Sequence, residues 1–251
     1  MAAARGVALG LAVLLGCTSW GPDVLPAHGR PAAVPGRPAG PVVVALGDSV
    51  PAGTACGCLP FPDLYARRIS AEARSVNLAH PGYTSADVRD QVRAPAVEDS
   101  VRSATVIMVM VGANDLAGVF DRGGDPDYRA AADGVEVNVA AALDRLRFLA
   151  GPSVPILVLG YWNVVEDGAV ARADYGDRTA EADLITGYAN DALRVAADAH
   201  AARYVPTRSA FRGHDGNADP TELLADDGDH PNARGHRAIA EAVYSAEPGP
   251  R

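Results

Sequence analysis

The chain has 251 residues, of which 48% are hydrophobic and 21% charged, which allows one large domain or two small ones. These proportions are typical of a globular protein and exclude collagen, coiled coil and wholesale disorder for the chain as a whole. The 22 basic residues are all Arg and face 31 acidic ones, giving a net charge of −9. A nucleic-acid-binding protein is therefore disfavoured, and a Lys nucleophile is excluded.

Residues 1–16 have the pattern of an export signal. Arg5 precedes an apolar run over residues 7–16 that is too short to span a bilayer. The tripeptide before Cys17, Leu-Leu-Gly, resembles the lipobox of bacterial lipoproteins, which implies that Cys17 carries lipid. An ordinary secretory signal cleaved nearby is the alternative. Both interpretations predict an exported protein, either secreted or held on the outer face of the membrane by an N-terminal lipid anchor alone.

Composition divides the rest of the chain. Residues 17–40 are rich in Pro, Gly and Ala without an apolar period, which predicts a tether. Residues 41–246 form one expected domain, and residues 247–251 a short tail.

Within that domain, short β-branched runs alternate with helical patterns. Buried parallel strands are expected at residues 42–46, 75–78, 106–111, 155–160 and 204–205. Helices are expected at residues 61–73, 85–92, 133–150, 180–202 and 232–244. This alternation predicts a three-layer α/β/α sandwich with a central parallel sheet.

In such sheets the ligand crevice lies beyond the carboxyl ends of the strands. The segments that follow the expected strands are residues 47–49, 79–82, 112–115, 161–163 and the stretch leading to Asp227 and His230. Hydroxyl, amide, carboxylate and imidazole groups should therefore meet at one edge of the sheet.

Ser49 is the candidate nucleophile, although no Gly-x-Ser-x-Gly elbow surrounds it. A Ser hydroxyl becomes nucleophilic when an imidazole takes its proton, and a carboxylate best fixes the tautomer of that imidazole. Asp227 precedes His230 by three residues, and Gly228 eases the turn that would bring the carboxylate to Nδ1. The backbone N–H groups of Ser49 and Gly82 and the side-chain amide of Asn114 are candidate oxyanion donors.

The four blocks that carry these residues resemble those of the SGNH (GDSL-like) hydrolase family. They are Val-Ala-Leu-Gly-Asp-Ser ending at Ser49, residues 77–84 around Gly82, Val-Gly-Ala-Asn-Asp around Asn114, and Asp-Gly-Asp-His-Pro-Asn around His230. The resemblance spans nearly the whole chain after residue 41. It implies the flavodoxin-like form of the sandwich, Ser49 as nucleophile, His230 as base, Asp227 as the orienting acid, and Ser49, Gly82 and Asn114 as the oxyanion hole.

Other side chains in the sequence are candidates for the same roles. The rival bases are His80, His200, His214 and His236. Asp226 is a less well placed substitute for Asp227, and Asp48 is interpreted as a hydrogen-bond acceptor that fixes the loop beside Ser49.

Cys56 and Cys58 are one residue apart, and in an exported protein such a pair is expected to form a disulfide. A zinc site is the poorer alternative, because two thiols supply half the usual ligands and no His lies nearby in the sequence. No metal or organic cofactor is expected.

The sequence thus predicts a monomeric serine hydrolase that cleaves carboxylic esters through an acyl-serine intermediate. Lipid acyl esters, small acyl esters and acetyl esters on glycans all remain open as substrates. Acyl transfer to an acceptor other than water, and a catalytically weak glycan-binding module tethered at the cell surface, are the alternative functions.

Overall fold

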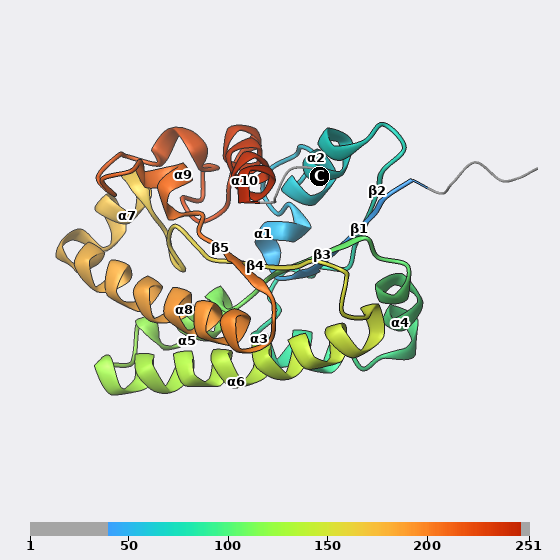
Figure 1. Ribbon diagram of the computed structural model, residues 1–251. Helices are drawn as coiled ribbons and strands as arrows, with labels where there is room; N and C mark the ends of the chain where they lie inside the picture. Colours follow the sequence, from blue (N-terminus) through green and yellow to red (C-terminus); the bar gives the residue numbers. More distant parts are fainter. Residues whose placement is uncertain (1–39, 247–251) are drawn as a thin grey trace, which may run out of the picture. The chain divides into compact units, whose positions relative to one another are not determined.

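The computed structural model describes residues 40–246, so the expected signal, the lipid site at Cys17, the tether and the tail lie outside the described residues. A five-stranded parallel sheet forms the middle layer, in the order β2-β1-β3-β4-β5 (Figure 1). The strands are β1 (Val42–Gly47), β2 (Arg74–Asn77), β3 (Val106–Met110), β4 (Ile156–Leu159) and β5 (Arg203–Val205). The predicted sandwich and its five strands are confirmed.

Helices cover both faces of this sheet (Figure 1). One face carries α3 (Ser85–Gln91), α4 (Pro95–Arg102), α5 (Ala113–Phe120), α6 (Asp125–Ala150) and α8 (Thr179–Ala199). The other carries α2 (Phe61–Ile69), α9 (Arg208–Arg212) and α10 (Ala233–Ala246). Short helices α1 (Ser49–Ala52) and α7 (Gly168–Asp174) and the 3-10 turns η1 (Gly176–Arg178) and η2 (Thr221–Leu223) lie in the connections.

The core is built around the inner strands of the sheet. All residues of β1 and β3 are buried, as expected for strands that helices cover on both faces. On α6 the buried side chains recur every three or four residues, which turns one stripe of the helix toward the sheet.

Three expected helix boundaries were wrong. The helix expected at residues 133–150 begins at Asp125, because Pro126 is tolerated in a first turn and the Asp127 carboxylate accepts from the N–H of Gly124. The helix expected at residues 61–73 ends at Ile69, where Ser70 takes up extended backbone. The helix expected at residues 180–202 spans Thr179–Ala199.

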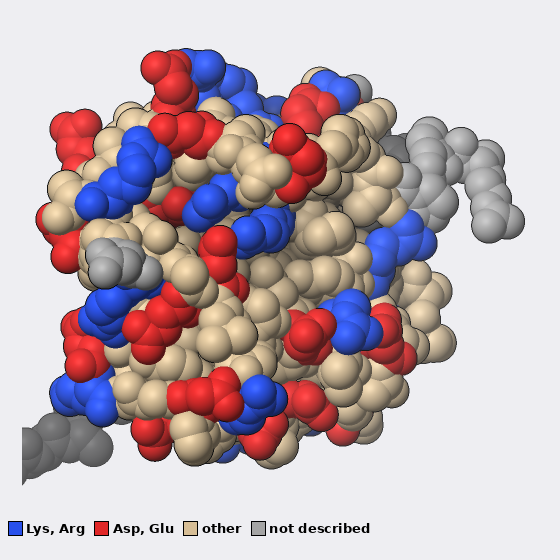
Figure 2. Space-filling view, turned by 90° about the vertical axis from the view of Figure 1, so that its left-hand side faces the viewer, with Lys and Arg blue, Asp and Glu red and all other residues tan. Residues whose placement is uncertain are grey.

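Among residues 40–246, no helix combines the length and the apolar character that a membrane span requires. Figure 2 looks onto the face where the strands end. Arg and acidic side chains are interspersed there, without an extended basic patch.

Candidate active site

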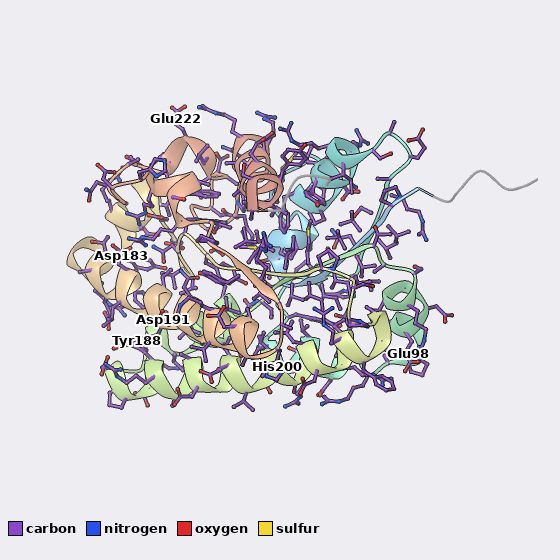
Figure 3. All side chains as sticks on the ribbon, in the orientation of Figure 1. Glu98, Asp183, Tyr188, Asp191, His200 and Glu222 are labelled. Carbon is purple, nitrogen blue, oxygen red and sulfur yellow. A yellow bond between two sulfur atoms is a disulfide. The ribbon has the colours of Figure 1, made fainter. Side chains whose placement is uncertain are left out.

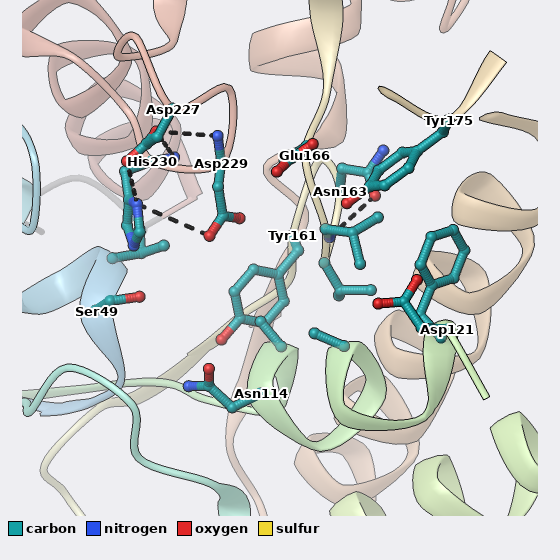
Figure 4. A pocket seen from close by; sticks show the side chains of 16 residues that line it. Ser49, Asn114, Asp121, Tyr161, Asn163, Glu166, Tyr175, Asp227, Asp229 and His230 are labelled. Atoms are coloured by element: carbon teal, nitrogen blue, oxygen red, sulfur yellow. Dashed lines mark hydrogen bonds and ion pairs between the residues drawn. The ribbon is translucent and has the colours of Figure 1, made fainter. Parts of the chain in front are cut away.

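A cavity of about 310 Å³ opens where β1, β3 and β4 end. Ser49, Asn114, Asp227 and His230 all line it (Figure 4), as the sequence predicted. Gly82 does not belong to its lining. The remaining lining residues are Val50, Ala113, Ala117, Phe120, Asp121, Tyr161, Asn163, Val164, Val165, Glu166, Tyr175 and Asp229.

Ser49 is the first residue of α1, which follows β1 after a single intervening residue. Gly47 makes this turn with φ of 143°, and a Cβ there would lie 1.9 Å from the carbonyl oxygen of Met110. The N–H of Asp48 donates to that same oxygen at 3.1 Å. The tight exit from the strand therefore requires glycine, and it presents Ser49 at the edge of the sheet.

Asp48 is fully buried beside Ser49. Its carboxylate accepts from the N–H of Val50 at 3.1 Å and from the hydroxyl of Tyr161, which follows β4. Burial raises the pKa of Asp48 to about 7, although both hydrogen bonds favour the ionised form. The interpretation of Asp48 as an acceptor that fixes the loop is confirmed.

The His230 ring and the Asp227 carboxylate are hydrogen-bonded, with 2.8 Å between Nδ1 and Oδ2. The other oxygen of Asp227 accepts from the N–H groups of Asp229 and His230 at 3.1 and 3.0 Å. Gly228 has φ of 69°, and a Cβ there would lie 2.4 Å from Cβ of Val170. Only glycine fits this turn, which folds the carboxylate back onto the imidazole.

This arrangement orients the ring. When Nδ1 donates to Asp227, Nε2 carries the free lone pair of the neutral imidazole, and Figure 4 shows the His230 ring above Ser49. Burial alone would raise the pKa of Asp227, but hydrogen bonds from the backbone N–H and the ring of His230 and from the N–H of Asp229 hold that pKa below its usual value. Asp227 therefore stays ionised and can stabilise a proton on His230.

Asn114 lies in the first turn of α5, a helix that the sequence analysis did not expect. Its Nδ2 donates to the carbonyl of Tyr83 at 2.8 Å, which fixes the amide and leaves its second N–H available. Gly82, in the segment after β2, is exposed, and its N–H donates to no described group.

The segments that carry Gly82 and Asn114 are tied together by hydrogen bonds. Asp115 accepts from the N–H and the hydroxyl of Ser85 at 2.8 and 2.6 Å. Asn138 on α6 donates to the same hydroxyl at 3.0 Å. These contacts join the starts of α3 and α5 to a long helix and hold both candidate oxyanion donors on one rigid support.

The rival bases all lie outside this cavity. His200, labelled in Figure 3, pairs with Asp144 at 2.6 Å on the outer layer of α6 and α8. His80 is exposed and stacks on Tyr83, and His214 is exposed in the loop after α9. Asp226 is exposed and does not line the cavity. A His–Asp pair alone therefore does not mark the site, whereas its position beside a Ser does.

His236 has a structural environment. It is fully buried on α10, and its Nδ1 accepts from the N–H of Phe61 at 3.2 Å. Burial lowers the pKa of His236 to about 4, so the ring is neutral and its proton lies on Nε2.

A disulfide joins Cys56 and Cys58, whose Cα atoms are 5.0 Å apart. Their sulfur atoms and a ring nitrogen of His236 lie within 4.8 Å of one another. No His lies near the two cysteines in the sequence, but the fold brings His236 close to them. A thiolate-bound metal would nevertheless need both sulfur atoms, which the disulfide consumes.

Sequence reasoning missed the far wall of the cavity. Phe120 and Asp121 come from the end of α5, and Glu166 and Tyr175 come from the segment between β4 and α8. None of them lies in a motif, and no spacing in the sequence could have brought them together.

Comparisons with known proteins agree on the fold. Three solved structures are similar to the chain. A lipase from a goat rumen metagenome has a TM-score of 0.68 at 21% identity, covering 82% of this chain and 97% of the other. An extracellular lipase from Streptomyces rimosus has a TM-score of 0.59 at 20% identity, covering 82% and 100%. A catalytic mutant of an acetylxylan esterase from Geobacillus stearothermophilus has a TM-score of 0.61 at 17% identity, covering 83% and 94%.

A search of curated proteins gave no match. The family model described as GDSL-like Lipase/Acylhydrolase family matches residues 45–238, a span that runs from β1 into α10 and holds every residue proposed for the chemistry. The protein is therefore an enzyme of the esterase and lipase class, and the chain belongs to the GDSL-like lipase/acylhydrolase family.

Proposed function

We propose that the protein hydrolyses carboxylic esters through a covalent acyl-Ser49 intermediate. The observation that carries the proposal is the 2.8 Å hydrogen bond between His230 and Asp227 in a cavity that Ser49 also lines. This combination supplies a nucleophile, a base and an orienting carboxylate.

In the proposed mechanism the Ser49 oxygen attacks the ester carbonyl while Nε2 of His230 takes its proton. Negative charge then develops on the carbonyl oxygen, where the N–H groups of Ser49 and Gly82 and the amide of Asn114 donate to it. His230 returns the proton to the leaving alcohol as the carbon–oxygen bond breaks. Water, activated by the same imidazole, then releases the acid and regenerates Ser49.

The cavity favours small substrates. Its volume of about 310 Å³ lies at the lower end of the usual range for ligand pockets. Carboxylates and amides make up much of its lining, which suits a long hydrocarbon chain poorly. We therefore favour short acyl esters, including acetyl esters on glycans, over long lipid acyl chains. The similarity to an acetylxylan esterase is consistent with this choice.

Export belongs to the same proposal, with Cys17 as the lipid attachment site of a monomeric enzyme outside the cytoplasm. The similarity of the chain to an extracellular lipase supports export. Metabolic labelling with a palmitate analogue tests the anchor, since Cys17→Ala should abolish labelling. An ordinary secreted protein would carry no label before the substitution either.

A fluorophosphonate probe and p-nitrophenyl esters of graded chain length test the chemistry. We expect the probe to label the parent protein but not Ser49→Ala, and both Ser49→Ala and His230→Ala to lose ester turnover. Asp227→Asn should retain more activity than either. His200→Ala is a matched control, because it breaks a similar His–Asp pair far from the cavity. Turnover by Ser49→Ala at the parental rate would refute the mechanism.

A further inference from the structure

The charges around the cavity are unbalanced. Besides the proposed catalytic groups, its lining includes the carboxylates of Asp121, Glu166 and Asp229, whereas no described lining residue is an Arg. Asp121 is neutralised, since its carboxylate pairs with Arg178 at 3.3 Å and is 80% exposed. The unbalanced charge therefore belongs to Glu166 and Asp229.

Neither of these two carboxylates has a dedicated cationic partner among the described residues. The nearest cation-forming group to Asp229 is Nδ1 of His230 at 3.8 Å, and that nitrogen bonds to Asp227. Glu166 has no ion pair with any described residue, and Asp174 and Asp229 add further negative charge near it. Figure 4 shows Glu166 and Asp229 above Tyr161.

Burial makes this imbalance significant. It raises the pKa of both Glu166 and Asp229 above the usual values, because partial removal from water disfavours their ionised forms. Oε2 of Glu166 is shielded from solvent and accepts no hydrogen bond from a described residue, although the hydroxyl of Tyr175 interacts with the same carboxyl group and favours its ionised form. A carboxylate oxygen in this condition is expensive to leave unpaired, so a ligand that brings positive charge there would offset the cost.

An aromatic ring completes the environment. Tyr175 lines the cavity beside Glu166, and its ring packs edge-on against Phe120 with 5.1 Å between the centroids. The combination of carboxylates and an aromatic ring is the chemistry that recognises ammonium groups in proteins. A volume of about 310 Å³ has room for a compact ammonium group next to the ester.

We propose that Glu166 is a specificity-determining residue that selects small esters bearing a cationic ammonium group over neutral and anionic esters of the same shape. This inference rests on the proposed function, because it assigns a substrate class to the same cavity. Asp229, on the same side of Tyr161, contributes to the same field, and Glu166 acts without taking part in bond making.

Isosteric substrate pairs test the proposal. Acetylcholine is compared with 3,3-dimethylbutyl acetate, in which carbon replaces the charged nitrogen. Ethyl 4-(trimethylammonio)butyrate is compared with ethyl 5,5-dimethylhexanoate, which places the charge on the acyl side instead. In at least one pair we expect kcat/KM to favour the cation by about tenfold at low salt, with the preference falling as salt screens the charge.

Glu166→Gln should reduce that preference at least about threefold, measured as the ratio of kcat/KM for the cationic and the neutral ester within each enzyme. Asp191→Asn is the matched control, since it removes the same charge from an exposed side chain of α8 and should keep the preference. If the neutral esters are hydrolysed but neither pair shows a preference, or Glu166→Gln keeps it, the inference is wrong and the proposed function stands. If no ester is hydrolysed and the fluorophosphonate does not label Ser49, the proposed function itself fails.

Discussion

Asp48→Asn should change the pH dependence of stability. Asp48 is fully buried, and its pKa of about 7 compares with 3.8 for an unperturbed carboxyl group. The folded-state pKa is raised, so below pH 3.8 the group is protonated in both states and has no differential effect. Between pH 3.8 and about pH 7, Asp48 ionises in the unfolded chain but stays largely protonated in the folded protein. The free energy of unfolding therefore falls as the pH rises through this range.

The size of the effect follows from the shift. A difference of roughly three pH units corresponds to about 4 kcal/mol of unfolding free energy. Asn keeps the shape of Asp48, can accept from Val50 through its oxygen and can donate to the oxygen of Tyr161 through its amide. The variant should therefore become more stable relative to the parent by up to about 4 kcal/mol between pH 4 and pH 8.

Urea unfolding of both proteins at pH 4, 6 and 8, followed by circular dichroism, measures this difference. Comparing the two proteins cancels the titration of every other carboxyl group that they share. Asp191→Asn serves as the control, since that side chain is 72% exposed and its replacement should change stability only slightly. Parallel stability curves for Asp48→Asn and the parent would refute the reasoning.

The other predictions concern the donors and the disulfide. Asn114→Ala should lower kcat by about 10² to 10³ with little change in KM, because its amide acts on the transition state; a pure KM effect would assign Asn114 to substrate binding instead. The double variant Cys56→Ser with Cys58→Ser should lower the melting temperature only modestly, because closing so short a loop contributes at most about 1.6 kcal/mol. The ester series and calorimetry measure these two effects, and a large loss of stability would contradict the second expectation. Mass spectrometry without reductant should count no free thiol at Cys56 and Cys58.

The parts of the fold that the sequence predicted are those with local causes. β1 and β3 are short, continuous runs of β-branched and apolar residues. This pattern is typical of strands that helices cover on both faces, and both strands are fully buried in the structure. The start of α6 was missed because Pro126 looks like a helix breaker, although proline fits a first turn. The whole of α5 was missed because Gly, Asn and Asp in succession also form turns.

The same distinction applies to the site. Asp227 and His230 are three residues apart, so a single turn brings them together and a sequence pattern suffices to predict the pair. The bond between Tyr161 and Asp48 joins residues 113 positions apart, and nothing in either segment indicates it. Glu166 is an acidic residue in a connection, which by itself predicts only a solvated side chain. Its partial burial in the wall of the cavity, next to Asp174 and Tyr175, is visible only in three dimensions.

The three acidic residues closest to the chemistry differ in their hydrogen-bond donors, and these donors decide what each can do. Asp227 accepts from two amides and an imidazole, which keeps it ionised below its usual pKa and able to hold a proton on His230. Asp48 has two donors but no access to water, so its pKa rises and its role is to fix the turn before Ser49. Asp229 has a raised pKa and no hydrogen-bond donor to its carboxylate among the described residues. The negative charge of Asp229 is therefore available to the substrate. Environments that give neighbouring carboxyl groups different pKa values also give them different roles.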